Sequence, residues 1–295
     1  MKHLIEYLWF KAFSIILRIM PFAAAMRFGA FIGRLVYYLL PFRKEVALLN
    51  IRTAFPEKPD REVVQILKDT YRNFAMTFFE YLTLYRLSPE RILSMVEIDQ
   101  RDLLFQIMGK EKGVVAITGH FGSFELMGVA VSALGIPMDV VVKPMKNPRI
   151  EKFLDDVRSK NNLGVVKTTD GFPAVVESIE ARKMIALVAD QDAGERGTRV
   201  KFFNIDSSTP VGPAILALRT GAPMIAGYIV RIAPARYKVH FHSVSDEELP
   251  ENFDEKVREI TQRYTTLLES YIERYPDHYL WFHKRWKSSG LYSSM

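Results

Sequence analysis

The feature that most restricts the fold is an alternation, from residue 113 to residue 275, of short apolar runs and longer segments with one apolar stripe. The run Gly113–Gly119 is rich in β-branched residues and bounded by glycine, which is typical of a buried strand. After Asn147-Pro148, a favourable N-cap and first turn, apolar residues recur at helical spacing. Strands that alternate with helices build a sheet with helices on its faces. We therefore predict an α/β fold around a mixed, largely parallel sheet of about seven strands, preceded by an N-terminal helical segment.

The boundaries of the expected elements follow from the same periodicity. Strands are expected at 113–119, 138–143, 164–168, 184–190, 200–204, 223–232 and 237–244. Helices are expected at 60–85, from Pro89, at 124–134, from Pro148, and at 171–182, 212–220 and 253–275, with a polar transition at 43–60. Sites in such sheets lie at the carboxyl ends of strands, and His120 directly follows the first strand of the series.

The basic charge of the chain is concentrated in its first 44 residues. Residues 1–44 carry seven lysines and arginines and a single acid, Glu6, whereas residues 45–295 carry 33 basic and 33 acidic side chains. The same 44 residues hold the most apolar stretches of the chain. Basic and apolar character together favour an anionic membrane surface over nucleic acid as a partner.

This N-terminal segment has the pattern of neither a standard transmembrane helix nor a cleavable signal. Its longest uncharged runs, Ile19–Met26 and Leu35–Phe42, are eight residues long, whereas a spanning helix needs about 20 apolar residues. Pro21 divides it into two amphipathic helices, which we expect to lie in the membrane interface with snorkelling cations. The alternatives are a pair of core helices and a single tilted span. We expect residues 1–44 to associate with the membrane and residues 45–295 to form the main domain.

The chain contains no cysteine. Disulfides, thiolate nucleophiles and cysteine-ligated zinc or iron–sulfur sites are therefore excluded. Ser123 does not lie in a Gly-x-Ser-x-Gly elbow, so a serine hydrolase is not expected either.

The segment Gly119-His120-Phe121-Gly122-Ser123-Phe124-Glu125 holds a histidine and an acid five residues apart. On a helix that spacing rotates by about 500°, so the two side chains meet only if His120 lies in a strand-to-helix turn and Glu125 in the first helical turn. A carboxylate that accepts from one imidazole nitrogen leaves the other free to take a proton from a hydroxyl. The alternative is a pair that only satisfies backbone groups of the loop.

The motif His120-x4-Glu125 after an apolar strand resembles the signature of the glycerolipid acyltransferase superfamily. Further blocks resemble the late lipid A acyltransferases, which add secondary acyl chains in lipopolysaccharide assembly. These blocks are Asn50, Phe55-Pro56-Glu57, Lys143 to Pro148, Asp190-Gln191-Asp192, Phe202-Phe203, Leu218 to Pro223, and Tyr279 to Lys287. The blocks span nearly the whole chain in order, and together they are more specific than the histidine motif alone.

The resemblance implies a reaction without an acyl-enzyme, a cofactor or a metal. His120 would deprotonate the hydroxyl of a 3-hydroxyacyl chain on a glucosamine lipid, and the oxygen would attack the thioester of an acyl carrier protein or acyl-CoA. Glu125 would hold His120 in the required tautomer. The oxyanion needs hydrogen-bond donors, and we expect them from the amides of Gly122 and Ser123 and from Arg158. A glycine often follows that arginine closely in the family, but here Gly164 is six residues on.

Other polar residues follow the predicted strands. Asp190-Gln191-Asp192 ends an apolar strand, which favours a structural or sugar-binding role over metal binding and leaves an Asx turn as the plainest alternative. The substrate-binding candidates are Lys143, Asn147, Asp190, Gln191, Asp192 and Lys201, and the basic side chains near these strand ends suit lipid phosphates. Each basic residue alone is better explained as a solvated charge.

Two further groups of residues are open to more than one interpretation. His240 and His242 share a strand face, but with no third ligand in reach they do not predict a zinc site. The tail that contains Trp281 and Trp286 suits a membrane interface or the docking of an acidic carrier protein, or else simple packing on the domain.

The resemblance therefore implies an acyltransferase of lipid A type on the cytoplasmic face of the bacterial inner membrane. Its expected partners are an acyl carrier protein or acyl-CoA donor, a glycolipid acceptor and an anionic membrane surface, and no nucleic acid. A related enzyme acting on a phosphoinositol mannoside or a lysophospholipid is the nearest alternative. A lipid-binding membrane protein without catalytic activity is the rival from another class.

Overall fold

The computed structural model describes residues 2–40 and 42–293, without the side chains of Lys2 and Arg18. The helices are α1 Lys2–Ile19, α2 Phe22–Leu39, α3 Lys44–Ala54, α4 Asp60–Leu84, α5 Pro89–Met95, α6 Arg101–Met108, α7 Phe124–Ala133, α8 Pro148–Lys160, α9 Gly171–Glu180, α10 Gly212–Thr220 and α11 Phe253–Arg274. The strands are β1 Val96–Ile98, β2 Val114–Thr118, β3 Met138–Val142, β4 Leu163–Lys167, β5 Met184–Val188, β6 Gly197–Phe202, β7 Ile205–Pro210, β8 Met224–Ala233 and β9 Arg236–Val244. Short 3-10 turns occur at η1 Gly194–Arg196, η2 Pro276–His278 and η3 Lys287–Ser289.

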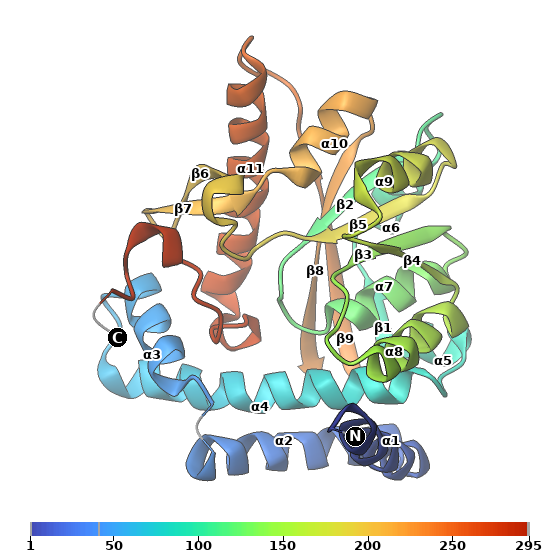
Figure 1. The fold of residues 1–295 in the computed structure, drawn as a ribbon, viewed down its shortest axis with the longest axis vertical. Helices are drawn as coiled ribbons and strands as arrows, with labels where there is room; N and C mark the ends of the chain where they lie inside the picture. Colours follow the sequence, from blue (N-terminus) through green and yellow to red (C-terminus); the bar gives the residue numbers. More distant parts are fainter. Residues whose placement is uncertain (1, 41, 294–295) are drawn as a thin grey trace.

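The centre of the described chain is a seven-stranded sheet in the order β1-β9-β8-β2-β5-β3-β4 (Figure 1). All neighbouring strands are parallel except β8 and β9, which form an antiparallel hairpin. Strand β2 lies between β5 and β8, and all five of its residues are buried. Because β2 and β5 are parallel and directly paired, the residues that follow them meet at one edge of the sheet.

Successive residues of β2 point to opposite faces of the sheet, as strand geometry requires. Val115 and Ile117 pack into the same apolar cluster as residues of α10 and α11, including Leu268. Val114 and Ala116 join a second cluster that contains residues of α5, α6, α7 and α8. The sheet is therefore covered by helices on both faces, which is why its central strand carries no alternation of polar and apolar residues.

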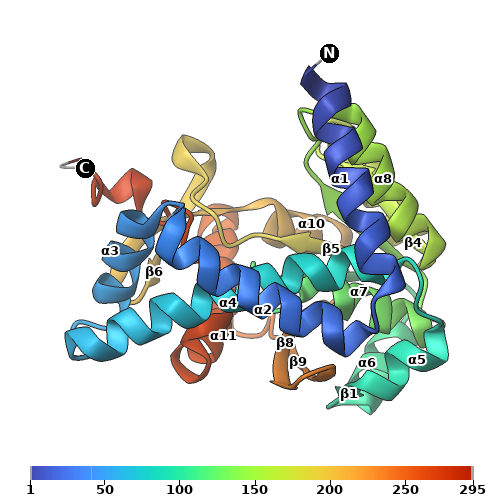
Figure 2. The same cartoon turned by 90° about the horizontal axis from the view of Figure 1, so that it is seen from below.

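The N-terminal helices lie against the rest of the protein. Figure 1 shows α4 running across one end of the sheet with α2 beside it, and Figure 2 shows α1 lying along α8. Leu17, Ala25 and Met26 are buried in the cluster that also contains Leu82 of α4. The side chain of Asn147, at the N-cap of α8, donates to the carbonyl oxygen of His3 at 2.9 Å. Helices α1 and α2 thus pack on the α/β domain along one of their sides.

Most of the predicted elements are confirmed, and two assignments are wrong. The break between the first two helices falls at Pro21, helix 60–85 is observed as α4, and Asn147 caps α8 as expected. Residues 200–204 were predicted as a strand of the main sheet, but β6 pairs only with β7 in a separate antiparallel hairpin. The seventh strand of the sheet is instead β1, three residues paired with β9 at the edge. The predicted polar transition contains α3.

No helix in the described ranges is both long enough and apolar enough by itself to cross a membrane. Helices α2 and α3 meet this requirement only as a pair, by length and composition, and their axes are bent by 100°.

Candidate active site

The turn after β2 places His120 at the carboxyl edge of the sheet. Gly122 has a φ of +56°, and a Cβ atom at this position would lie 2.1 Å from the carbonyl oxygen of Ile229. Glycine is therefore required for both the backbone conformation and the close approach to β8. Ser123 then leads into α7, and Glu125 occupies its first turn. The predicted strand–turn–helix arrangement of His120 and Glu125 is confirmed.

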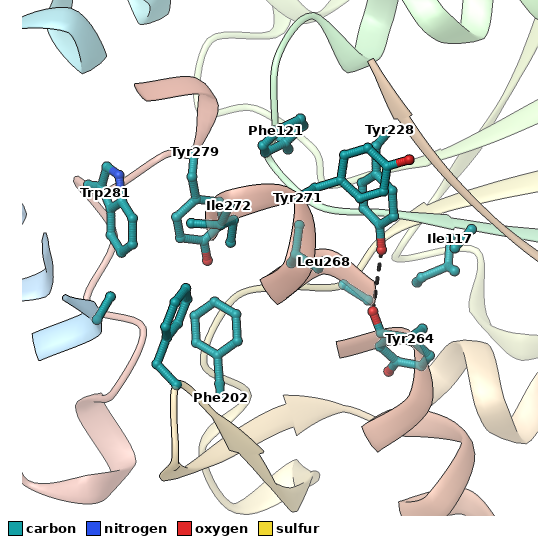
Figure 3. Close-up of a cluster of buried hydrophobic side chains, with 14 of the residues drawn as sticks. Ile117, Phe121, Phe202, Tyr228, Tyr264, Leu268, Tyr271, Ile272, Tyr279 and Trp281 are labelled. Atoms are coloured by element: carbon teal, nitrogen blue, oxygen red, sulfur yellow. Dashed lines mark hydrogen bonds between the residues drawn. The ribbon is translucent and has the colours of Figure 1, made fainter. Parts of the chain in front are cut away.

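A segment from the far end of the chain holds this turn. Phe121 forms an isolated antiparallel bridge with Tyr279, and the amide of Leu280 donates to the carbonyl oxygen of His120 at 3.0 Å. The amide of Gly122 donates to the carbonyl oxygen of His278 at 2.8 Å. Figure 3 shows Phe121 and Tyr279 within the aromatic cluster that fills the space between β8, α11 and this segment.

The imidazole of His120 pairs with Asp190. Its Nδ1 atom lies 2.7 Å from Oδ1 of Asp190, which follows β5 and has a side chain only 4% exposed. Burial and the negative charge of this carboxylate raise the pKa of Tyr279. His120 itself is only partly buried, and Nε2 of Gln191 lies 3.5 Å from its Nε2 atom.

The ionisation of the pair follows from these contacts. Burial disfavours the imidazolium of His120, but the charge and hydrogen bond of Asp190 outweigh it, with a further contribution from Glu125, so the pKa of His120 is raised above 6.5. Burial also works against the carboxylate of Asp190, yet His120 holds the pKa of that carboxyl below its ordinary value of 3.8. Asp190 is thus a buried carboxylate whose proton donor is Nδ1 of His120.

Glu125 makes a different pair from the one predicted. Its Oε1 atom accepts from Nη2 of Arg158 at 2.6 Å, and Asp155 accepts from Nη1 of the same guanidinium at 3.2 Å. Burial lowers the pKa of Arg158, but the attraction of Glu125 and Asp155 outweighs it, and the net shift is upward. Arg158 is therefore a partly buried, permanently charged cation between two carboxylates.

The prediction that Glu125 holds the tautomer of His120 is corrected by this geometry. The hydrogen bond to Nδ1 comes from Asp190, on the neighbouring parallel strand, and Glu125 turns toward α8, where Arg158 offers a fork of donors that suits a carboxylate. Glu125 still lies close enough to raise the pKa of His120 through its charge.

A cavity of about 520 Å³ opens at His120 and extends between the sheet and helices α7 and α8. Its inner wall is apolar and includes Val131, Met138, Leu163 and Met184. His120, Glu125 and Arg158 lie among the residues that line it, so the titratable groups stand beside an apolar chamber. Such a chamber suits a hydrocarbon chain.

The other predicted site residues are divided between the cavity and the scaffold. Gln191 and Lys143 line the cavity. Asn147 is buried against α1, where it bonds the carbonyl oxygen of His3 and the carboxylate of Glu6. The carboxylate of Asp192 accepts from the amides of Gly194 and Ser288. Asp192 thus has the structural role in a turn that the sequence analysis gave as an alternative.

The remaining candidates also lie apart from the histidine. Lys201 is exposed on β6 and pairs with Asp206 at 3.1 Å. Ser123 is buried and lines neither this cavity nor the second cavity described below. The amide of Gly122 is engaged with His278, so in this structure it does not point at a substrate atom.

The structure also shows the contacts of two groups of residues outside the site that the sequence left open to more than one interpretation. Trp281 and Trp286 are fully buried, so their indoles pack on the domain. His240 pairs with Asp99 and His242 with the hydroxyl of Tyr271. Across residues 2–40 and 42–293, no group of three or more histidine, aspartate or glutamate side chains has the arrangement of a metal site.

Sequence reasoning missed Asp155, Tyr279 and the role of Asp190 as the partner of His120. A signal for Asp190 was present, because it directly follows an apolar strand just as His120 does. What the sequence lacked was the strand order, which places β5 beside β2.

Comparison with known proteins shows the class of enzyme to which this fold and site belong. The chain resembles the lipid A biosynthesis palmitoleoyltransferase of Escherichia coli (strain K12), with 24% identity over 271 residues, 91% of this chain and 87% of the relative. It also resembles the lauroyltransferase of the same organism, 21% identical over 272 residues, with the same shares covered. A phosphatidylinositol mannoside acyltransferase of Mycolicibacterium smegmatis matches over 172 residues at 24% identity, covering 57% of each chain. The protein is an acyltransferase.

The family can be stated as well. The family model described as bacterial lipid A biosynthesis acyltransferase matches residues 1–288. The chain therefore belongs to this family, as the sequence blocks led us to expect.

Proposed function

We propose that this acyltransferase moves a fatty acyl chain from the thioester of an acyl carrier protein, or of CoA, to a hydroxyl of a lipid A precursor. The observation that carries the proposal is the His120–Asp190 pair at the mouth of an apolar cavity. Membership of the lipid A family supports the acceptor class, and two of the three named relatives are lipid A biosynthesis acyltransferases.

In the proposed reaction, His120 is the general base. Because Nδ1 donates to Asp190, Nε2 carries the lone pair that takes the proton of the acceptor hydroxyl. The alkoxide oxygen attacks the thioester carbonyl carbon, and the tetrahedral intermediate collapses with cleavage of the C–S bond. The imidazolium returns its proton to the leaving thiolate, so the products are the ester and the free thiol.

Two groups are proposed to stabilise charge during this step. Arg158 lines the cavity beside Glu125 and provides a fixed cation near the reacting carbonyl. Glu125 anchors Arg158 and adds to the charge that stabilises the imidazolium of His120.

We also propose that α1 and α2 bind the cytoplasmic face of the bacterial inner membrane. Among the described residues, 14 of the 21 exposed large hydrophobic side chains lie between Leu4 and Phe42. The same part of the chain carries Lys11, Arg27 and Arg34 and so combines apolar area with positive charge. This combination favours an anionic lipid surface.

The direct test is transfer by purified protein with labelled acyl carrier protein and acyl-CoA donors. Acceptors are a tetra-acylated lipid A precursor, a phosphatidylinositol mannoside and a lysophospholipid. We expect transfer to the lipid A precursor, loss of transfer in His120→Ala, and a large loss in Glu125→Ala. His240→Ala is the matched control, because His240 also pairs with an aspartate but lies on β9.

Three results would contradict parts of this proposal. Transfer only to one of the other acceptors would move the enzyme to a different substrate class. Full activity of His120→Ala would remove the general base. Lipid binding without transfer from either donor would favour the non-catalytic alternative.

A further inference from the structure

A second cavity, of about 200 Å³, reaches the same histidine from another side. It shares only His120, Phe124 and Glu125 with the first cavity. The rest of its wall comes from Gly122, from one face of α4 between Thr70 and Tyr81, and from residues 277–280 of the C-terminal segment. Two separate chambers therefore meet at the proposed general base.

The outer rim of this second cavity is aromatic and open. Phe74 and Phe78 line it and remain 48% and 41% exposed. The ring of Phe78 also lies 6.5 Å from the ring of Phe10 on α1, in an edge-on contact. Through α1 the rim joins the exposed apolar side chains of the N-terminal helices, which lie beside α4 in Figure 1.

Polar side chains in the wall are already engaged within the protein. The amide of Asn73 bonds Asp277 and accepts from Arg231, and Arg231 also donates to the hydroxyl of Thr77 at 3.3 Å. These bonds leave the wall with little capacity to bind a charged headgroup. An apolar chain that enters from the rim is the ligand that best matches the aromatic lining.

The two cavities differ in a way that assigns their occupants. The first is more than twice as large and ends among buried side chains such as Leu163 and Met184, so it can enclose the chain of a donor. The second is smaller, and its exposed rim contacts α1, which we propose to bind the membrane. A thioester held in the first cavity would present its carbonyl at His120, and an attacking hydroxyl must come from elsewhere.

We propose that the second cavity binds the hydrocarbon chain that carries the acceptor hydroxyl, which slides in from the membrane past Phe74 and Phe78. This inference rests on the proposed function. It assigns a separate wall of the protein to the acceptor chain. It also makes α4 the element that selects the acceptor, while α7 and α8 select the donor.

The test separates the two chains by one substitution in each cavity. Thr77→Phe fills the second cavity, and Thr77→Val is its size-matched control, which loses only the hydrogen bond from Arg231. Gly128→Leu reduces the first cavity, where a Cβ atom would already lie 3.8 Å from Leu163. The measurements are KM for the acceptor and relative rates with donors of graded chain length.

We expect Thr77→Phe to raise KM for a hydroxyacyl acceptor on the order of tenfold or more, with donor preference unchanged. Gly128→Leu should shift preference toward shorter donors and leave KM for the acceptor unchanged. Acceptors with shorter hydroxyacyl chains should lose less in Thr77→Phe, because they fill less of the cavity.

The assignment is overturned if Thr77→Phe alters donor preference, or if its KM for the acceptor matches that of Thr77→Val. Should Thr77→Phe fail to fold by circular dichroism, Phe78→Trp narrows the rim and is subject to the same two criteria. Failure of the proposed function has a different signature, because wild-type protein would then transfer nothing to any hydroxyacyl acceptor.

Discussion

At the scale of single residues, the site depends on two acids with different positions. Asp190 is buried and bonds Nδ1 of His120, whereas Glu125 lines the cavity and bonds Arg158. Only the first arrangement fixes which imidazole nitrogen holds the proton. Asp190 is therefore a positioning residue in the proposed mechanism, and its effect should be visible in the pH dependence.

We expect Asp190→Asn to lower kcat by about 10²–10⁴-fold. The negative charge of Asp190 raises the pKa of His120, so the base form of wild type is lost as pH falls through a value above 6.5. Removing that charge lowers the pKa, and the acid limb of the kcat/KM profile should move to lower pH. Asp99→Asn, which alters the remote pair with His240, is the control. An unmoved acid limb in Asp190→Asn would exclude this coupling.

Gly122 provides a second prediction, because two separate constraints apply there. We expect Gly122→Ala to unfold more readily and to lose transfer activity, since the added Cβ atom collides with the carbonyl oxygen of Ile229. Gly135→Ala is the matched control: its φ of +84° is also unfavourable for alanine, but no atom lies within 4 Å of the added Cβ. Its cost should be about 1 kcal/mol. Equal urea midpoints for the two variants would contradict the collision.

At the scale of elements, α4 contacts both the N-terminal helices and the sheet. A buried ion pair links α4 to the sheet. Glu80 is fully buried on α4, and its Oε1 atom accepts from Nε of Arg231 on β8 at 2.8 Å. The hydroxyl of Tyr237 donates to the same oxygen. The pair fixes the position of α4, and therefore of the second cavity, relative to the sheet.

Removing one member of this pair should destabilise the protein strongly. Glu80→Leu or Arg231→Met alone leaves a buried charge without its partner, which costs about 3–5 kcal/mol. We expect the double variant to be more stable than either single variant, because both charges are then removed. Urea unfolding of the four proteins gives the comparison. Additive losses would show that the two side chains act independently.

A comparison of the predicted and observed elements shows which parts of the fold and site the sequence could predict. Strands such as β2 and β8 and helices such as α4 were predictable, because apolar runs and stripes encode burial directly. The three-residue β1 was missed because its strand character comes from pairing with β9. The partner of His120 was missed for the same reason: Asp190 is 70 residues away, and only the order of strands brings it close. Glu125 was identified as a site residue because it lies close to His120 in the sequence. Long-range packing, however, makes Arg158 its hydrogen-bond partner.

At the scale of the whole molecule, the exposed apolar side chains of α1 and α2 predict membrane binding. Replacing Trp9, Ile19 and Leu39 together by glutamate removes side chains that are 75%, 79% and 65% exposed. Sedimentation with anionic vesicles should fall at least about tenfold, because each buried side chain of this size contributes about 1.5–3 kcal/mol. Deleting residues 1–40 should release the protein as well.

The control for this prediction uses exposed apolar residues elsewhere. Ile232 and Phe253 are 54% and 42% exposed but lie outside the N-terminal helices. Their replacement by glutamate should leave vesicle binding unchanged. Binding that persists in the triple variant, or is lost in the control, would place the membrane contact on another surface.

The bridge between Phe121 and Tyr279 has a consequence for the order of events during protein synthesis. The turn around His120 leaves the ribosome more than 150 residues before the segment that holds it. Domains fold as their residues emerge, but here the sheet can assemble while the histidine turn still lacks its support. A nascent or prematurely terminated chain would thus contain both the cavity and the histidine motif, but the turn that carries His120 would not be held in place. Under the proposed mechanism, we expect catalytic competence only after translation has delivered residues 278–280.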